Sequence, residues 1–226
     1  MMRLFLVCSI LFLQFRSFAQ FKESDFHCRR DSVISQTSYG SVYITRDRTC
    51  ALYDWLCPKP KNWMEEHDME ENFPELANFL NTHQSLGSLP RYWNNLYEYQ
   101  GKYYVYGPSD WMGNSPDYIS DSFLVEITSD ITYFRIKKTE VIRSSELLLT
   151  VDLYGEEATL RIRQLATPEG ASLWEYKIKN ESWSELKVSS DHVRGYDLIN
   201  NDCVNQKCYQ EFHFDEIDLS RLKFAD

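Results

Sequence analysis

Residues 157–178, EATLRIRQLATPEGASLWEYKI, alternate between apolar and polar side chains in two short runs. In the second run Trp174 and Tyr176 fall on one side of the chain, and Glu175 and Lys177 fall on the other. Successive side chains of a β-strand point to opposite faces, and antiparallel sheets commonly keep one face dry and one wet. The pattern therefore predicts two antiparallel strands, with Trp174 and Tyr176 on the buried face.

Similar runs continue on both sides of this stretch. A hairpin with Gly101 in its turn is expected at 96–106, and a loop rich in turn-forming residues follows at 107–120. Further strands are expected at 122–127, 131–138, 146–153, 157–164, 171–178, 185–189, 192–198 and 207–214. Roughly eight to ten sequential strands with short connections are typical of a mostly β fold, an antiparallel meander that closes into a barrel or folds into a sandwich.

The sequence before this meander has a different character. Residues 20–90 are expected to form an N-terminal extension with short strands, one of them at 41–45, and one helix. The helix is expected near residues 74–82, because Pro74 suits its first turn and the apolar residues that follow share one face. Residues 91–226 are expected to form the barrel-like domain.

The first nineteen residues have the pattern of a cleavable signal peptide. Arg3 supplies the positive start, Leu4 to Leu13 form the apolar run, and Ser17 and Ala19 are small residues before a cleavage site after Ala19. A lipid anchor on Cys8 is a weaker alternative, because a small residue is expected before a lipidated cysteine. The protein is therefore expected to be secreted or periplasmic, with no integral membrane segment.

The expected mature chain is strongly acidic. Removal of residues 1–19 leaves 22 Lys and Arg against 34 Asp and Glu, a net charge of −12. Such a surface repels nucleic acid, so no nucleic-acid partner is expected, whereas a basic protein partner stays possible.

Five cysteines follow the signal peptide, and an exported protein is expected to oxidise them. Cys203 and Cys208 flank a turn-like segment and are expected to form one bridge. Cys50 with Cys57 is the matching N-terminal pair, which would leave Cys28 free. Cys28 with Cys50 and Cys28 with Cys57 are open alternatives.

No motif predicts a metal, a cofactor or a catalytic residue. His27 and Cys28 match no common zinc spacing, the acidic run at 65–71 lacks the glycine of a calcium loop, and turn chemistry explains the acids at 110–121. The chain also has no HExxH metalloprotease motif and no GxSxG nucleophile elbow. An enzyme is therefore not favoured, although an unrecognised hydrolase stays open.

The pattern from Trp93 to Phe214 includes Gly101-Lys102-Tyr103-Tyr104 and Gly107-Pro108-Ser109-Asp110-Trp111. It resembles the lipocalin-like, or calycin-like, β-barrel domains of secreted bacterial proteins of unknown function. The resemblance covers a little over half the chain and implies a closed barrel, but it brings no functional residues with it.

A small closed barrel favours binding of one small apolar or aromatic ligand. Trp174, Tyr176 and Phe134 are the candidate ligand-binding residues on its inner face. The alternative is a protein-binding inhibitor or immunity-type envelope factor, whose acidic surface would attract a basic partner. A cavity at one end of the barrel would favour the first function.

Overall fold

The structure is a computed structural model, and it describes residues 28–38, 40–57, 86–107, 116–127, 131–153, 155–203 and 212–226. The expected signal peptide, the expected helix near 74–82 and Cys208 lie outside these residues. None of the helices in the described part of the chain is long and apolar enough to cross a membrane.

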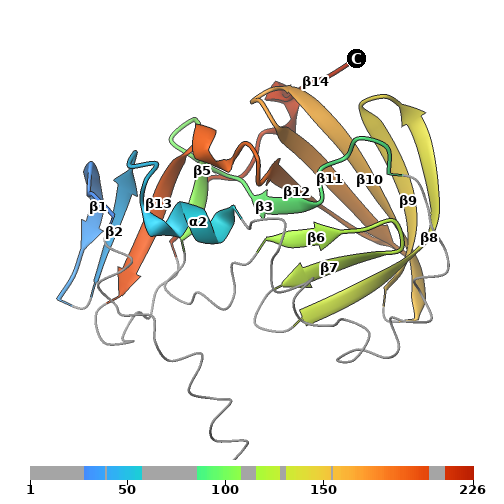
Figure 1. The fold of residues 1–226 in the computed structure, drawn as a ribbon, viewed down its shortest axis with the longest axis horizontal. Coiled ribbons are helices and arrows are strands. Elements are labelled where there is room, and N and C mark those ends of the chain that lie inside the picture. The colour runs from blue at the N-terminus through green and yellow to red at the C-terminus, as the bar shows by residue number, and fades with distance from the viewer. Residues whose placement is uncertain are drawn as a thin grey trace, which may run out of the picture.

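Eight strands form a closed antiparallel barrel, as the meander predicts (Figure 1). In the order of the barrel wall they are β11 (Ala171–Ile178), β12 (Glu181–Ser189), β3 (Tyr92–Asn95), β6 (Asp117–Ile119), β7 (Phe123–Ile127), β8 (Ile131–Arg143), β9 (Glu146–Leu153) and β10 (Glu156–Thr167). The pairing of β10 with β11 closes the wall, and the short β14 (Lys223–Phe224) adds to β10.

A second sheet of five strands lies beside the barrel, on the left in Figure 1. Its order is β1 (Ser32–Gln36), β2 (Gly40–Thr45), β13 (Asp197–Cys203), β5 (Lys102–Gly107) and β4 (Tyr97–Tyr99). The pair β13–β5 is parallel and the other pairs are antiparallel. This sheet joins strands from both sides of the expected boundary at residue 90/91.

The hairpin expected at 96–106 is present as β4 and β5, but it belongs to the five-stranded sheet and not to the barrel wall. Gln100 and Gly101 form its turn with φ of 51° and 73°. Two successive positive φ angles match the twist of the flanking strands, and glycine adopts such angles without steric cost. The strand expected at 192–198 is also displaced, because Val193–Gly195 form a 3-10 turn and β13 starts at Asp197.

The barrel interior is packed with the apolar side chains that the alternation predicts. Leu160, Ile162 and Trp174 are fully buried there, while Lys177 is exposed. The rings of Trp93 and Trp174 meet edge to face with centroids 5.5 Å apart.

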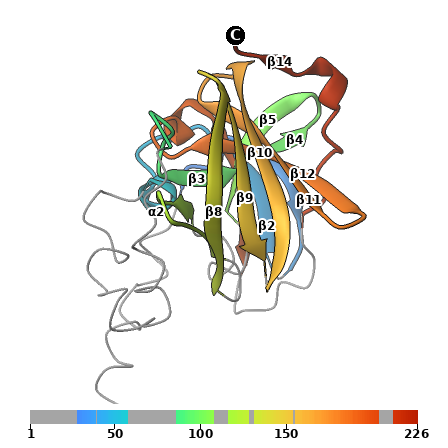
Figure 2. The same cartoon turned by 90° about the vertical axis from the view of Figure 1, so that its right-hand side faces the viewer.

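A second core lies between the barrel and the five-stranded sheet. Leu173, Leu186 and Val188 point out of the barrel and pack against Tyr43 and Leu198 of the sheet. In Figure 2 the barrel strands face the viewer and β2 lies behind them. Residues 171–174 of β11 and 186–189 of β12 are therefore buried on both faces.

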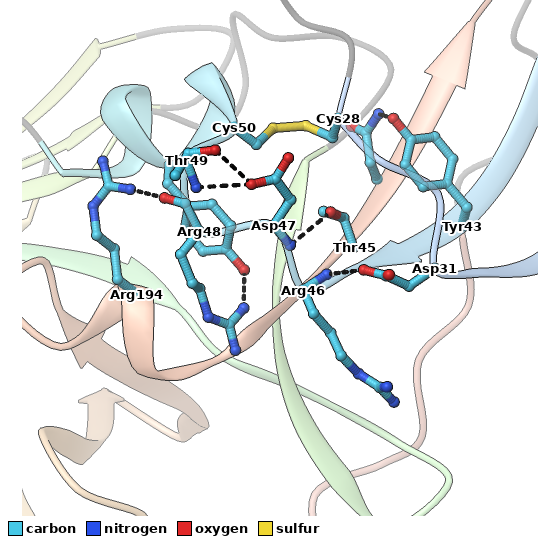
Figure 3. Close-up of a disulfide and its surroundings, with 12 residues drawn as sticks. Cys28, Asp31, Tyr43, Thr45, Arg46, Asp47, Arg48, Thr49, Cys50 and Arg194 are labelled. Atoms are coloured by element: carbon cyan, nitrogen blue, oxygen red, sulfur yellow. Dashed lines mark hydrogen bonds between the residues drawn. A yellow bond between two sulfur atoms is a disulfide. The ribbon is translucent and has the colours of Figure 1, made fainter.

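A disulfide joins Cys28 to Cys50 at the start of α2 (Ala51–Leu56), the α-helix among the described residues (Figure 3). The Cα atoms of the two cysteines are 5.1 Å apart. The expected pairing of Cys50 with Cys57 is wrong, and Cys57 is a free thiol. Cys50 and Cys57 flank opposite ends of α2. The rise of the helix separates their Cα atoms by about 10 Å, which is beyond the ~7 Å that a disulfide can span.

Candidate functional site: a charged cluster inside the barrel

Four ionisable side chains point into one end of the barrel. Asp117 comes from β6, Glu126 from β7, and Glu185 and Lys187 from β12; we call them the charged cluster. The register places them inside, because Glu185 lies directly opposite the buried Trp174 in the β11–β12 pair. Directly opposed residues of an antiparallel pair share one face of the sheet.

Lys187 is the centre of the charged cluster, with a side chain that is only 2% exposed. Its Nζ donates to Asp117 Oδ2 at 2.5 Å and to Asn95 Oδ1 at 2.9 Å, and it lies 2.7 Å from Glu185 Oε2. Burial disfavours the charged form, but Asp117 and Glu185 outweigh it and raise the pKa of Lys187 above its ordinary value. The side chain is therefore an ammonium with its donors occupied.

Glu126 is the second unusual group of the cluster. The hydroxyl of Tyr176 donates to its Oε1 at 2.8 Å. Burial raises the pKa of Glu126 to about 7, with Lys187 opposing this rise and Asp117 adding to it. Burial also raises the pKa of Tyr176 well above its usual value, so Tyr176 remains a hydrogen-bond donor. Glu126 therefore changes its charge near neutral pH.

Aromatic rings line the charged cluster from the solvent to the interior. The ring of Tyr176 stacks on Trp183 with centroids 4.8 Å apart and planes within 3°. Trp183 is 39% exposed and the Glu185 side chain 36% exposed, so this end of the site reaches solvent. At the inner end, the Trp174 ring lies 5.2 Å from Lys187 Nζ.

Trp174 carries a polar atom that the barrel leaves unsatisfied. Its side chain is fully buried, and Nε1 has no hydrogen-bond partner among the described residues. Buried indole N–H groups usually find an acceptor, so this donor lacks the partner that such groups ordinarily have.

Two of the three candidate ligand-binding residues from the sequence, Trp174 and Tyr176, thus contact the charged cluster. The third, Phe134 of β8, lies opposite Leu124 among apolar side chains, one layer further into the barrel. That these three residues bind a ligand stays a prediction.

The sequence pattern does not identify Lys187 and Glu126 as site residues, and it attributes Asp117 to turn chemistry. Spacing is the signal that could have identified Glu126. It is two residues from Leu124 and therefore lies on the same inward face of the strand.

The opposite end of the barrel holds a pocket of about 240 Å³. Its lining includes none of the three candidate residues; it consists of Leu86, Gly87, Ser88, Leu89, Val141, Ser144, Ser145, Glu146, Leu147, Ile162 and Gln164. Glu146 in this lining pairs with Arg161 at 2.6 Å. The pocket is smaller than the ~300 Å³ at which small-molecule sites usually begin.

In the described ranges, no group of three or more His, Cys, Asp and Glu side chains is placed to hold a metal ion. Cys28 is bonded to Cys50, so the zinc alternative with His27 and Cys28 loses its thiolate ligand.

Comparison with known proteins finds no matching family model, no similar curated protein and no similar solved structure. The class that the structure defines is a closed eight-strand antiparallel barrel, backed by a second sheet, with an ion-paired lysine inside the barrel.

Proposed function

We propose that the protein binds a small ligand with an apolar or aromatic body at the charged cluster. The observation that carries this proposal is a buried ammonium, Lys187, inside a barrel of eight strands. The interior of so small a barrel is ordinarily filled by apolar side chains or holds one small ligand. Polar groups that converge among aromatic rings, with perturbed pKa values, are the usual mark of a binding site.

Stability alone gives a poor account of this arrangement. Removing two charges from water costs several kcal/mol per ion, and well-packed apolar side chains often stabilise as much as a buried ion pair. The cluster also includes Glu126, whose raised pKa means that its environment disfavours its charge. A bound ligand that contacts these groups gives a reason for their burial.

The site is at the end of the barrel and not at its centre. The layers beyond Trp174 are occupied by side chains such as Phe134 and Ile136. Trp183 and Glu185 are the exposed members of the site, and a ligand that stacks on the Tyr176–Trp183 pair reaches the charged cluster from solvent.

We further propose that the barrel is a lipocalin-like domain of an exported, secreted or periplasmic protein. Its closed antiparallel wall supports the first part, and the Cys28–Cys50 disulfide supports the second, because disulfides persist mainly in oxidising compartments. The inhibitor and hydrolase alternatives stay predictions from the sequence.

Isothermal titration calorimetry of the purified protein against a panel of small aromatic compounds, neutral, cationic and anionic, tests ligand binding. We expect at least one compound to bind saturably at one site. Trp183→Ala should weaken that binding by about fivefold or more, since stacking on an aromatic ring contributes on the order of 1 kcal/mol.

Trp55→Ala is the matched control, because Trp55 of α2 is also 39% exposed and lies outside the barrel wall. Its affinity for the same compound should equal that of the wild type. Equal affinities for the wild type and Trp183→Ala, or no saturable binding across the panel, would contradict the proposal.

A further inference from the structure

We infer that the ligand is an organic amine, whose ammonium group is accepted by Glu126 and Glu185 while its aromatic body stacks on Trp183. This inference rests on the proposed function and names the chemical class of the ligand.

The charged cluster holds more carboxyl groups than ammonium groups. Asp117, Glu126 and Glu185 bring three carboxyl groups, and Lys187 brings the one ammonium of the charged cluster. Lys187 already has Asp117, Glu185 and Asn95 as partners. In the described part of the chain Glu126 forms no ion pair, and its hydrogen bond comes from the neutral hydroxyl of Tyr176. The group that lacks a charged partner is therefore a carboxyl group.

Anionic, neutral and cationic ligands would interact differently with this site. An anion would lie beside three carboxyl groups, and the cation that could offset them is already paired. A neutral ligand would leave the Glu126 carboxylate desolvated. A cation pairs with the carboxylate, and the exposed Trp183 ring also attracts cations.

The unsatisfied indole of Trp174 is a second and independent sign of a ligand. Its N–H is fully buried beside the charged cluster and lacks an acceptor among the described residues. It cannot be satisfied by the ammonium group, which is a donor only. The ligand is therefore expected to carry a heteroatom acceptor or to bring a water to this depth.

Glu126 also predicts how binding depends on pH. The charged and titratable groups that face it are Asp117 from β6, Tyr176 from β11, and Glu185 and Lys187 from β12. Since the pKa of Glu126 is about 7, an ammonium group that pairs with its carboxylate must displace a proton at pH 6 but rarely at pH 8. Affinity for an amine should therefore rise by about tenfold between pH 6 and pH 8.

Calorimetric titration with three ligands of one shape measures the charge preference: tryptamine, the alcohol tryptophol and the anion indole-3-acetate. Tryptamine keeps its charge at both pH values, since alkyl ammonium groups have a pKa of about 10. At pH 8 we expect tryptamine to bind at least about tenfold more tightly than tryptophol, and indole-3-acetate to bind most weakly. The affinity for tryptophol should not rise between pH 6 and pH 8, since a neutral ligand gains nothing from the Glu126 carboxylate.

Glu126→Gln keeps an acceptor for Tyr176 and removes the carboxylate. It should lower the pH 8 affinity for tryptamine by about tenfold and abolish its pH dependence. Glu140→Gln is the matched control, because Glu140 is an exposed carboxylate of β8 that pairs with Lys138. It should bind all three compounds as the wild type does.

The outcomes separate the two proposals. If tryptophol or indole-3-acetate binds as tightly as tryptamine, or if Glu126→Gln leaves tryptamine affinity unchanged, the amine inference is overturned while ligand binding stands. If other compounds of the panel bind but none of these three does, the amine inference also fails. If nothing binds, the proposed function itself fails.

Discussion

Lys187 occupies a position that an apolar side chain would ordinarily fill. Its neighbours on the inner face, Trp174 and Ser172, are fully buried, and its side chain is as well covered as theirs. It stays charged because two carboxylates and the Asn95 amide oxygen take its donors. Loss of any one carboxylate would leave a buried charge poorly compensated, so the members of the cluster depend on each other.

Glu126→Gln should change how stability depends on pH. The pKa of Glu126 is about 7 in the folded protein and near 4.5 when unfolded, so between these values the folded state holds the extra proton. The free energy of unfolding therefore falls as pH rises from about 4.5 to 7. At pH 8 the variant, which has no proton to lose, should be more stable than the wild type by about 2–3 kcal/mol.

Urea denaturation from pH 4 to pH 8 measures this difference, with Glu140→Gln as the control that should follow the wild type. At pH 4, where Glu126 is protonated in both states, Glu126→Gln and the wild type should be about equally stable. Parallel curves for the two proteins at all pH values would mean that the environment of Glu126 does not raise its pKa.

The sequence predicts the inner face of β11 correctly but not that of β12. Trp174 and Tyr176 alternate with charged residues, so the buried face of β11 is evident. In β12 the apolar residues are Leu186 and Val188, and the same reasoning would place them inside the barrel. They pack outward on the five-stranded sheet, and Lys187 is inside. An alternating pattern identifies the buried face of a strand, but it does not show which of the two cores covers that face.

The hairpin turns could be predicted from the local sequence, but the pairing of strands within the sheets could not. The β4–β5 turn follows from Gln100-Gly101, and β9 and β11 have the expected bounds. The parallel pairing of β13 with β5 joins residues about ninety positions apart, and no local pattern encodes it. The sequence alone therefore could not show that the β4–β5 hairpin belongs to the second sheet.

The Cys28–Cys50 disulfide connects the approach to β1 with the start of α2. Around it, Asp47 accepts hydrogen bonds from the backbone N–H and the hydroxyl of Thr49 (Figure 3). Cys50 precedes the first helical residue of α2 and makes no side-chain cap, so the bridge and this turn fix the helix start. The disulfide therefore holds α2 against the second core.

Cys28→Ser should destabilise the protein by about 3 kcal/mol, because the bridge closes a loop between residues 22 positions apart. Chemical denaturation of the variant and of the wild type measures the loss. Cys57→Ser is the control: it removes the free thiol, whose Sγ donates to the Ser190 carbonyl at 3.3 Å, and serine keeps a donor there. A loss as large in Cys57→Ser as in Cys28→Ser would contradict the assigned pairing.

The whole molecule is held together by the core between the barrel and the five-stranded sheet. This core contains barrel residues such as Leu173 and Leu186, sheet residues such as Tyr43 and Leu198, and Leu52 of α2. Because β11 supplies Leu173 to this core and Trp174 and Tyr176 to the barrel core, neither layer can lose its packing without exposing the other. The barrel and the sheet should therefore unfold as one cooperative unit.

Leu173→Ala and Leu160→Ala form a matched pair that tests this cooperativity. Both leucines are buried, but Leu173 faces the sheet and Leu160 faces the barrel interior. Each substitution should lower the free energy of unfolding by about 2–5 kcal/mol, as buried Leu→Ala changes usually do. Amide hydrogen exchange in increasing urea should give one unfolding free energy for β2 and β9 in each variant, lowered equally in both strands. If Leu173→Ala instead freed β2 to exchange while β9 kept its protection, the sheet would be a separate unit, and the boundary near residue 90 would describe the energetics better than the shared core does.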